Sequence, residues 1–242
     1  MPHMKTISNV ESRISRLNWP QIVASLHQTG WARTGQLLTE DECHALRDLY
    51  ADGGLFRSKV VMARYHFGLG EYKYFAYPLP ALVGGLRESL YARLVEVANE
   101  WSAKLGIKPA YPPAHSEFIR QCGAKGQKRP TPLMLRYERG GYNCLHQDLY
   151  GEIYFPLQTV FMLDRPDEDF EGGEFVLVEQ RPRAQSAAHV IAPRQGEGVV
   201  FTTRWRPVQG SRGYYRVNIR HGVSAVTRGL RHTLGIVYHD AQ

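Results

Sequence analysis

Two histidines and one aspartate stand at spacings that could hold a metal ion. His146 and Asp148 are two residues apart, so on an extended segment both side chains point to the same face. His221 lies in an alternating run, where it shares one strand face with aliphatic residues at positions 217, 219 and 223. Two imidazoles and one carboxylate are the donor set typical of non-haem Fe(II), which leaves coordination positions open for substrate and oxygen.

An arginine follows His221 at a spacing of ten residues. This residue, Arg231, has the same strand parity as Thr233, and a hairpin turn near Arg228–Gly229 would bring their shared face beside His221. A buried arginine needs an anionic partner because an unpaired interior charge is very costly, and the nearby sequence supplies no obvious carboxylate. A carboxylate-bearing cosubstrate, held by both arms of the guanidinium, would be such a partner.

Each of these signals has an ordinary interpretation when it is taken alone. A His-x-Asp triplet such as residues 146–148 occurs often by chance, and a single histidine on a strand, such as His221, is more often structural. The joint pattern of the triplet, the strand-borne histidine and Arg231 is far harder to attribute to chance. We therefore predict an Fe(II) site with a carboxylate-binding arginine beside it.

The overall charge points to an anionic partner, and its distribution is uneven. The chain of 242 residues contains 30 Lys and Arg against 23 Asp and Glu, a net charge of +7. All of this excess lies in residues 178–242, which hold ten Arg, no Lys and three acidic residues. The exclusive use of arginine in this segment indicates sites at which the planar guanidinium pairs with phosphate or carboxylate.

Cysteine content and hydropathy indicate the compartment. The three cysteines, Cys43, Cys122 and Cys144, are widely spaced and form no Cys-x-x-Cys motif, which argues against a disulfide framework or a cysteine-ligated zinc site. We therefore expect a reducing, cytoplasmic location. No apolar run is long enough for a membrane span, so no membrane is expected among the partners.

The elements that must position these residues change in type along the chain. Residues 1–132 read as helical support and residues 133–242 as strands, which predicts an α+β fold of one continuous domain with an antiparallel barrel of about eight strands. Helices are predicted from Asn18 to Gly30, from the capping box that begins at Thr39, and over residues 82–105. Strand-like runs, one of them interrupted by Pro156, cover residues 133–137, 153–163, 174–179, 189–191, 198–203, 214–223 and 230–238. The proline indicates an edge position or a bulge.

The order of these motifs resembles that of the Fe(II)/2-oxoglutarate-dependent dioxygenases, whose fold is a double-stranded β-helix, a jelly-roll-like barrel. The resemblance covers roughly residues 133–242 and rests on Arg136-Tyr137, His146-x-Asp148, Gly172-Gly173-Glu174, Gly196-x-Gly198, and His221 with Arg231. It implies that three residues bind iron as the catalytic centre: His146, Asp148 and His221. It also implies that Arg231 holds the far carboxylate of 2-oxoglutarate, with Tyr137 and Thr233 beside it.

The whole chain is also similar to a bacterial family of predicted oxygenases that demethylate damaged nucleic acids. Segments 70–80, 145–152 and 179–183 carry this similarity, and Arg136-Tyr137 with segment 145–148 resembles the AlkB-type repair dioxygenases. The AlkB-type pattern after the distal histidine is absent, and an arginine ten residues after it is the spacing of prolyl-hydroxylase-like members.

These resemblances imply an activity on damaged DNA or RNA. An N-methyl group on a base would be oxidised with O2 and 2-oxoglutarate, and succinate, CO2 and formaldehyde would be the products. One alternative is a hydroxylase of a protein side chain or a small molecule on the same scaffold. Another is a metal-bound barrel that binds a partner without catalysis.

Substrate contacts are expected on two segments. Residues 53–80 contain seven aromatic residues interleaved with cations, a composition suited to an unstacked base and its phosphates, although most of these rings are expected to pack against the barrel. Residues 204–216 lead to the strand of His221 and would either rim the mouth of the barrel or form an ordinary charged surface. The candidates are Arg57, Arg64, Tyr74, Arg204 and Arg206.

Overall fold

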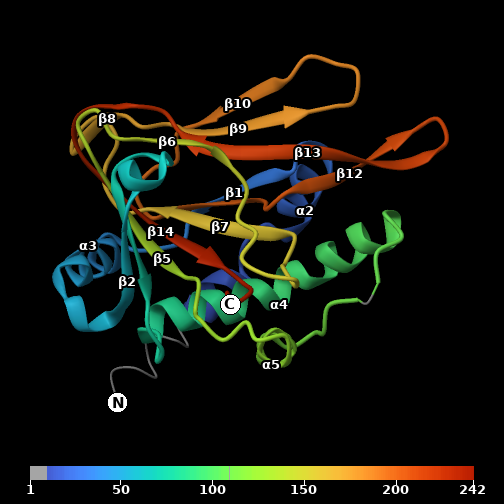
Figure 1. Cartoon of the computed structure of the whole chain (residues 1–242), viewed down its shortest axis with the longest axis horizontal. Coiled ribbons are helices and arrows are strands. Elements are labelled where there is room, and N and C mark those ends of the chain that lie inside the picture. Colours follow the sequence, from blue (N-terminus) through green and yellow to red (C-terminus); the bar gives the residue numbers. More distant parts are fainter. Residues whose placement is uncertain (1–9, 109) are drawn as a thin grey trace.

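The structure, a computed structural model, describes residues 10–108 and 110–242. The α-helices labelled in Figure 1 are α2 (Trp19–Thr29), α3 (Glu40–Asp48), α4 (Ala81–Lys104) and α5 (His115–Ala124). Short 3-10 helices occupy η1 (Leu49–Ala51), η2 (Gly53–Leu55) and η3 (Met62–Tyr65). Among the described helices, none has both the length and the apolar character needed to cross a membrane.

The three helices predicted from the sequence are confirmed, and two of them have the capping residues expected. The side chain of Asn18 accepts a hydrogen bond from the backbone N–H of Gln21 at the start of α2, and Gly30 ends this helix at φ 82°. Thr39 and Glu42 form the predicted capping box of α3. Helix α4 lies within one residue of its predicted bounds. Helix α5 is an addition to the prediction.

The strands form two sheets that face each other. In chain order they are β1 (Trp31–Gln36), β2 (Phe56–Val61), β3 (Gly68–Leu69), β4 (Glu71–Phe75), β5 (Leu133–Glu138), β6 (Tyr142–His146), β7 (Leu157–Met162), β8 (Phe170–Gly172), β9 (Phe175–Gln180), β10 (Ala187–Ile191), β11 (Glu197–Thr202), β12 (Trp205–Gly210), β13 (Gly213–Val223) and β14 (Val226–Val237). The eight-stranded sheet has the order β1-β11-β7-β14-β5-β4-β2, with β8 paired to β14. The six-stranded sheet has the order β10-β9-β13-β6-β3, with β12 paired to β13. Figure 1 shows the β9–β10 and β12–β13 ribbons extending beyond this double-stranded β-helix.

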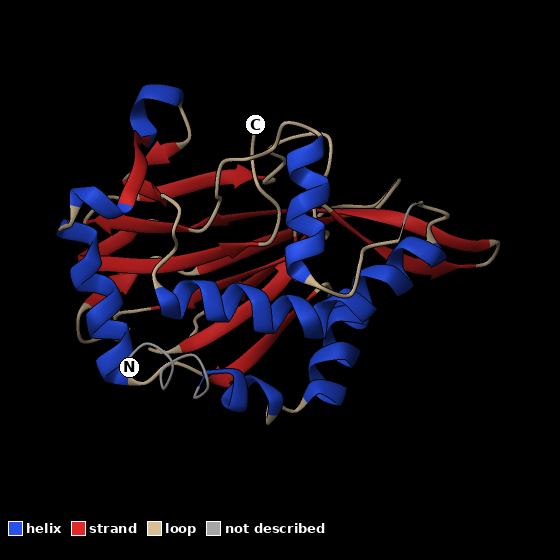
Figure 2. Cartoon of the chain, turned by 90° about the horizontal axis from the view of Figure 1, so that it is seen from below, coloured by secondary structure: helices blue, strands red, loops and turns tan. Residues whose placement is uncertain are grey.

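The helices cover the outer face of the eight-stranded sheet, as Figures 1 and 2 show. Leu86, Leu90 and Leu94 recur at every fourth position of α4, are fully buried, and share one core cluster with Phe161 of β7 and Leu234 of β14. Strand β7 is buried at all six positions because its alternate residues face the helices and the barrel interior. The alternate residues of β7 and β14 that face away from the helices therefore point into the barrel, where they can line a binding site.

The structure corrects the sequence prediction in three places. Residues before 133 supply strands as well as helices, and β4 pairs directly with β5 across the predicted boundary at residue 132. Pro156 precedes β7, which is a central strand and not an edge strand. The hairpin turn expected at Arg228–Gly229 is wrong, since both residues lie within β14 and pair with β8; the chain passes at residues 224–225 from β13 to β14, which belongs to the other sheet.

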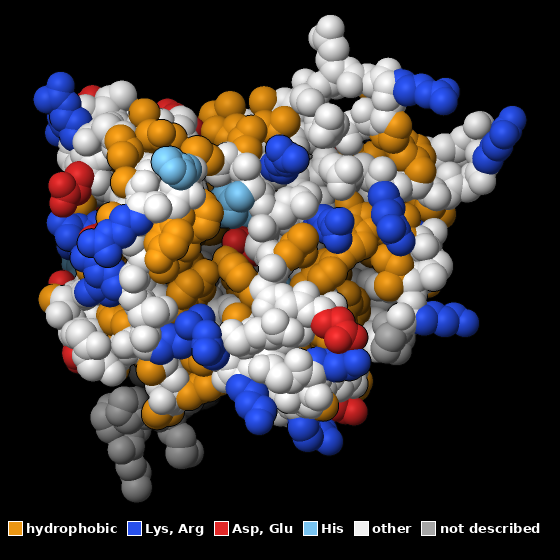
Figure 3. Space-filling view, in the orientation of Figure 1, with side chains coloured by type: hydrophobic (Ala, Val, Ile, Leu, Met, Phe, Trp, Pro, Cys, Tyr) orange, Lys and Arg blue, Asp and Glu red, His pale blue; other side chains and the backbone are white. Residues whose placement is uncertain are grey.

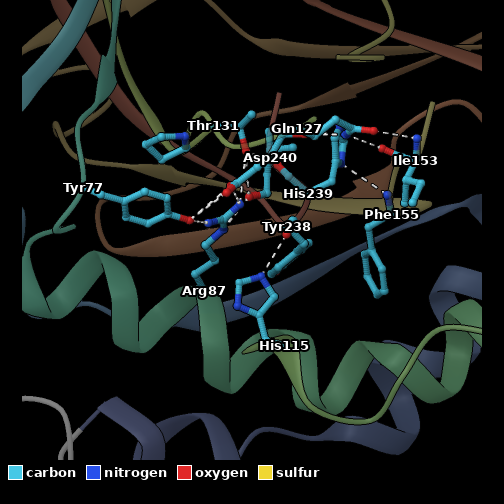
Figure 4. Close-up of polar contacts among 12 residues, drawn as sticks. Tyr77, Arg87, His115, Gln127, Thr131, Ile153, Phe155, Tyr238, His239 and Asp240 are labelled. Atoms are coloured by element: carbon cyan, nitrogen blue, oxygen red, sulfur yellow. Dashed lines mark hydrogen bonds and ion pairs between the residues drawn. The ribbon is translucent and has the colours of Figure 1, made fainter. Parts of the chain in front are cut away.

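A buried polar network fixes the end of β14 and the loop that follows β6 (Figure 4). Arg87 of α4 donates from Nε to the backbone oxygen of Val237 at 2.9 Å and pairs through Nη2 with Oδ1 of Asp240 at 2.8 Å. The two paired side chains are 2% and 1% exposed. Gln127 forms hydrogen bonds with both the backbone oxygen and the backbone N–H of Ile153. These contacts hold the β6–β7 loop against the C-terminal residues.

Candidate metal and cosubstrate site

The candidate metal ligands come from β6 and β13, which are neighbours in the six-stranded sheet. His146 at the end of β6 is the register partner of His221 on β13, and Asp148 follows two residues after β6. The ligating atoms of the three residues all lie within 4.8 Å of one another. Nε2 of His221 is 3.1 Å from Oδ2 of Asp148, and Nε2 of His146 is 3.6 Å from its Oδ1. The structure thus brings together the three residues selected from the sequence.

Neighbouring groups orient these side chains and set their charge. Nδ1 of His146 is 2.8 Å from the backbone oxygen of Cys144, which leaves Nε2 for a metal ion. The Tyr150 hydroxyl donates to Oδ1 of Asp148. Burial lowers the pKa of His221, which favours the neutral, metal-binding imidazole. Although burial opposes it, His146 and His221 hold the pKa of Asp148 well below its usual range.

A cavity of about 380 Å³ lies beside the three candidate ligands and reaches Arg231 on β14. Arg231 is 1% exposed, and its Nε and Nη1 have no hydrogen-bond partner among the described residues. The guanidinium carbon lies 5.5 Å from the ring centre of Tyr137 and 5.9 Å from that of Phe170. A buried cation without a protein carboxylate is costly, so this arrangement indicates an anionic ligand.

Two further buried polar atoms belong to residues that line the same cavity. Oη of Tyr137 and Nε2 of Gln158 form no hydrogen bond with any described residue. Burial raises the pKa of Tyr137, so its hydroxyl stays protonated and can donate to a carboxylate. Thr233, the next inward residue of β14 after Arg231, also lines the cavity. Buried polar groups normally have partners, and a ligand would satisfy these.

The donor set fits Fe(II), and the cavity fits 2-oxoglutarate. Two imidazole nitrogens with one carboxylate oxygen suit non-haem iron and leave room for further ligands. The fork of Arg231 matches the geometry of a carboxylate, and the Tyr137 hydroxyl can add a hydrogen bond to it. The side chains of this site therefore support Fe(II) and 2-oxoglutarate as the cofactors.

The N-terminal substrate candidates lie in three different environments. Tyr74 is 8% exposed and packs with Leu133 and other apolar residues. The guanidinium of Arg57 lies 4.5 Å from the centre of the Tyr74 ring, and its Nε donates to the backbone oxygen of Pro130. Arg64, in η3, is exposed. Arg57 and Tyr74 thus form a packed pair, whereas Arg64 presents its side chain to solvent.

The two C-terminal candidates also differ. Arg204 is exposed, and its guanidinium carbon lies 5.2 Å from the centre of the Trp205 ring. Arg206 is 4% exposed and pairs through Nη2 with Oε2 of Glu179 at 2.8 Å. Arg206 is therefore an interior residue and does not rim the barrel as expected, because Glu179 of β9 neutralises it.

Sequence reasoning missed two residues of the site. Tyr150 continues the two-residue spacing of His146 and Asp148, and that spacing could have marked it as a neighbour of the carboxylate. Gln158 is a polar residue on a strand that is otherwise buried and mostly apolar. A lone amide in such a strand was the available signal, but only the folded structure shows that its nitrogen lacks a partner.

Known proteins resemble this chain in fold and in sequence. An oxidoreductase of the 2-oxoglutarate-Fe(II) oxygenase family from Burkholderia pseudomallei matches with a TM-score of 0.51 at 16% identity over 93% of each chain. A prolyl hydroxylase from Trichoplax adhaerens, solved with a hypoxia inducible factor peptide fragment, matches with a TM-score of 0.54 at 15% identity, over 92% of this chain and 89% of that one. At such identities the likeness shows the fold, which is the predicted double-stranded β-helix.

Sequence relatives define the family more closely. An uncharacterized protein of Mycobacterium tuberculosis is 47% identical over 167 residues, which cover 69% of this chain and 72% of that protein. A family model described as an oxygenase catalysing oxidative methylation of damaged DNA matches residues 70–241. This match includes strands β4 to β14 and every candidate ligand, and the chain belongs to this oxygenase family.

Proposed function

We propose that this protein is an Fe(II)/2-oxoglutarate-dependent dioxygenase that removes methyl groups from alkylated nucleic-acid bases. In this proposal three residues hold the metal ion: His146, Asp148 and His221. Arg231 binds the far carboxylate of the cosubstrate, assisted by Tyr137 and Thr233. The observation that carries the proposal is the guanidinium of Arg231, which is buried in the cavity beside the candidate ligands with two unpartnered nitrogens.

The reaction follows from this arrangement. When bound, iron and 2-oxoglutarate supply an oxidant for C–H bonds. One O2 and one 2-oxoglutarate convert N–CH3 to N–CH2OH with release of succinate and CO2, and the hydroxymethyl group then leaves as formaldehyde with transfer of a proton to the base. Phe175 and Phe201, whose rings lie 6.0 and 4.8 Å from that of His221, help to keep water from the reacting groups.

Two observations support a nucleic-acid substrate. The family description refers to damaged DNA, and the excess positive charge of the chain lies entirely in residues 178–242. A hydroxylase of a protein side chain or small molecule is the second candidate function. It is favoured by the spacing of ten residues between His221 and Arg231, which resembles that of prolyl-hydroxylase-like enzymes.

A turnover screen tests the proposal. Protein loaded with Fe(II) is mixed with 2-oxoglutarate and with single-stranded oligonucleotides that each carry one methylated base, with peptides, or with small metabolites. We expect succinate and formaldehyde in equal amounts with a methylated oligonucleotide, and no formaldehyde with its unmethylated counterpart or with the His221→Ala variant. Turnover on peptides or metabolites alone would select the hydroxylase, and a folded protein without any succinate release would indicate a non-catalytic barrel.

Metal binding gives a separate check of the ligands. The Asp148→Ala variant removes the carboxylate at the centre of the group, so we expect it to lose stoichiometric Fe(II). An Asp148→Ala protein that still binds one equivalent of Fe(II) would contradict the assignment.

A further inference from the structure

The positive charge of the C-terminal segment is exposed, and its negative charge is neutralised internally. The acidic residues of segment 178–242 each pair with arginine: Glu179 with Arg206 and Arg181, Glu197 with Arg33, and Asp240 with Arg87. Six arginines of this segment are exposed and form no ion pair with any residue that the structure describes: Arg183, Arg194, Arg204, Arg212, Arg216 and Arg220. The surface therefore carries positive charge that the protein itself does not balance.

Four of these six, Arg204, Arg212, Arg216 and Arg220, lie on or beside the β12–β13 ribbon. At the base of the ribbon, the guanidinium carbons of Arg204 and Arg216 lie 5.2 and 5.1 Å from the Trp205 ring. The ring of Tyr154 lies 5.4 Å from the same indole. Guanidinium groups bind phosphates, and both guanidinium planes and aromatic rings stack on bases. The six residues of β12 span roughly 20 Å, a length that several nucleotides can follow.

The base of the ribbon is joined directly to the metal-binding segment. Gln147, which stands between two candidate ligands, donates from Nε2 to the backbone oxygen of Arg204 at 3.0 Å and to that of Ile219 at 2.9 Å. Strand β13 itself runs from the tip of the ribbon at Gly213 to His221 near its other end. A polymer that follows the ribbon is therefore led to the cavity.

Exposed aromatic residues also border the cavity. Tyr65 and Phe67 are 57% and 47% exposed, and their rings stack with centres 5.5 Å apart. Phe67 lines the cavity, and the exposed Arg64 adjoins Tyr65. Figure 3 shows hydrophobic side chains gathered around histidines on this face, with Lys and Arg side chains on the projecting ribbons. Exposed aromatic pairs of this kind are typical of binding surfaces.

We propose that the β12–β13 ribbon and the exposed ring pair of Tyr65 and Phe67, here called the aromatic mouth, form one surface. This surface binds single-stranded nucleic acid across the metal site. Phosphates lie on Arg204 and Arg216, and neighbouring bases stack on Tyr65 and Phe67. This inference rests on the proposed function for the chemistry inside the cavity. A base that enters a cavity must leave its helical stack, and a single strand avoids the cost of unpairing. Charge complementarity selects this polyanion over a neutral metabolite.

Binding of a short, unmethylated, fluorescently labelled DNA strand to the full chain tests the ribbon. The double variant Arg204→Gln/Arg216→Gln changes only exposed side chains, so the fold is retained. We expect its Kd to rise about tenfold or more, and the slope of log K against log salt to become shallower by about 1.4, because each of the two lost phosphate contacts to a single strand contributes about 0.7. The matched control is Arg165→Gln/Arg228→Gln, which removes the same charge from exposed side chains near β8. We expect the control to bind like the unaltered protein.

A second variant tests the mouth. Tyr65→Ser/Phe67→Ser removes the exposed ring pair, and we expect weaker binding of the strand with little change in salt slope, because stacking is not an ionic contact. Unchanged binding in either double variant, or an equal loss in the arginine control, would overturn the surface. Tighter binding of a duplex than of the single strand would overturn the single-strand assignment.

The outcomes separate this surface from the demethylation reaction. Ribbon-dependent binding without formaldehyde release from any methylated oligonucleotide would keep the surface and reject the proposed function. Formaldehyde release together with unchanged binding by the ribbon variant would keep the proposed function and reject the surface.

Discussion

At the scale of single residues, the cavity contains polar atoms to which the protein gives no partner. Arg231, Tyr137 and Gln158 each contribute at least one such atom. A buried donor left unsatisfied costs about 1–3 kcal/mol, and a charged group costs more. An anion that satisfies them recovers this free energy, so ligand binding and stability are coupled at this site.

The coupling predicts an unusual response to Arg231→Met. Because the variant removes an unpaired buried charge, we expect the Tm of the cofactor-free protein to be unchanged or higher. We also expect the rise in Tm with 2-oxoglutarate to disappear, and the KM for 2-oxoglutarate to increase at least about tenfold, since a charge-assisted pair is lost. Thermal unfolding with and without 2-oxoglutarate measures the first two effects, with the exposed Arg165→Met as control. A normal 2-oxoglutarate shift in Arg231→Met would remove this residue from the cosubstrate site.

Tyr150 contacts the proposed metal site through Asp148. Burial, followed by the Asp148 charge, raises the pKa of Tyr150, so the hydroxyl remains a donor to the carboxylate. We expect Tyr150→Phe to weaken Fe(II) binding by about 10- to 100-fold, the range found when groups that orient metal ligands are removed. Metal titration monitors the change, and Tyr142→Phe, on an exposed side chain of β6, is the control. Equal Fe(II) affinities in Tyr150→Phe and Tyr142→Phe would show that the Tyr150 hydroxyl does not contribute to metal binding.

At the scale of elements, the turn between β8 and β9 is built around the side chain of Arg231. Gly172 and Gly173 have φ angles of 70° and 64°, in the left-handed region that favours glycine. A Cβ on Gly173 would lie 2.7 Å from Cδ of Arg231 and 2.9 Å from a methyl group of Val226. The predicted Gly-Gly-Glu turn thus lies directly against the arginine that we propose to bind the cosubstrate.

This close approach predicts a specific effect of Gly173→Ala. The new methyl group displaces Arg231, so we expect the KM for 2-oxoglutarate to rise several-fold in addition to the loss of stability of about 1–2 kcal/mol from the strained backbone. Gly140→Ala is the matched control, since it has φ 85° and nothing among the described residues within 4 Å of its added Cβ. Steady-state kinetics that gave the same KM for both variants would contradict the role of this contact.

At the scale of the whole molecule, the helical layer is tied to the end of the barrel by the buried pair of Arg87 and Asp240. Breaking a buried pair by removing one partner leaves an uncompensated charge and typically costs about 3–5 kcal/mol. We therefore expect Arg87→Met to lower the free energy of unfolding by about this amount, as measured by urea denaturation. Arg165→Met, at an exposed ion pair, should change it by less than about 1 kcal/mol. A small loss in Arg87→Met would mean that the network in Figure 4 contributes little to stability.

Two histidines, the half-buried His115 and the buried His239, predict how stability depends on pH. Burial lowers the pKa of His115 and of His239 to about 3, whereas in the unfolded chain both titrate near the ordinary value of 6.5. Between these values the unfolded state binds protons that the folded state does not, so stability falls as the pH drops from 6.5 toward 3, by about 1.4 kcal/mol per pH unit for each histidine. His115→Gln keeps a donor for the backbone oxygen of Tyr238, and we expect it to remove one histidine's share of the slope. Urea unfolding across this pH range gives the free energy of unfolding at each pH. Equal slopes of this free energy against pH in the unaltered protein and in His115→Gln would contradict the prediction.

Much of the fold could be predicted from the sequence where the signal is local. Asn18, Gly30 and Thr39 mark helix ends because capping depends on residues a few positions apart. The strand of His221 alternates as predicted, with Val217, Ile219 and His221 buried. Strands β1, β2 and β4 were missed because each pairs with residues distant in sequence or lies toward a sheet edge, where mixed polar composition weakens the alternation.

The sequence by itself determined which residue types could bind a metal ion and a carboxylate. The alternation of an extended chain places His146 and Asp148 on one face, and it marks His221 and Arg231 as inward positions of their strands. These two strands, β13 and β14, belong to different sheets. Only the tertiary structure decided which polar groups have partners. It gives Arg206 a carboxylate in Glu179, gives Arg231 none among the described residues, and leaves the amide nitrogen of Gln158 free within the cavity walls. These differences arise from contacts between separate strands, and the burial that makes an unpaired group costly exists only after the sheets have closed.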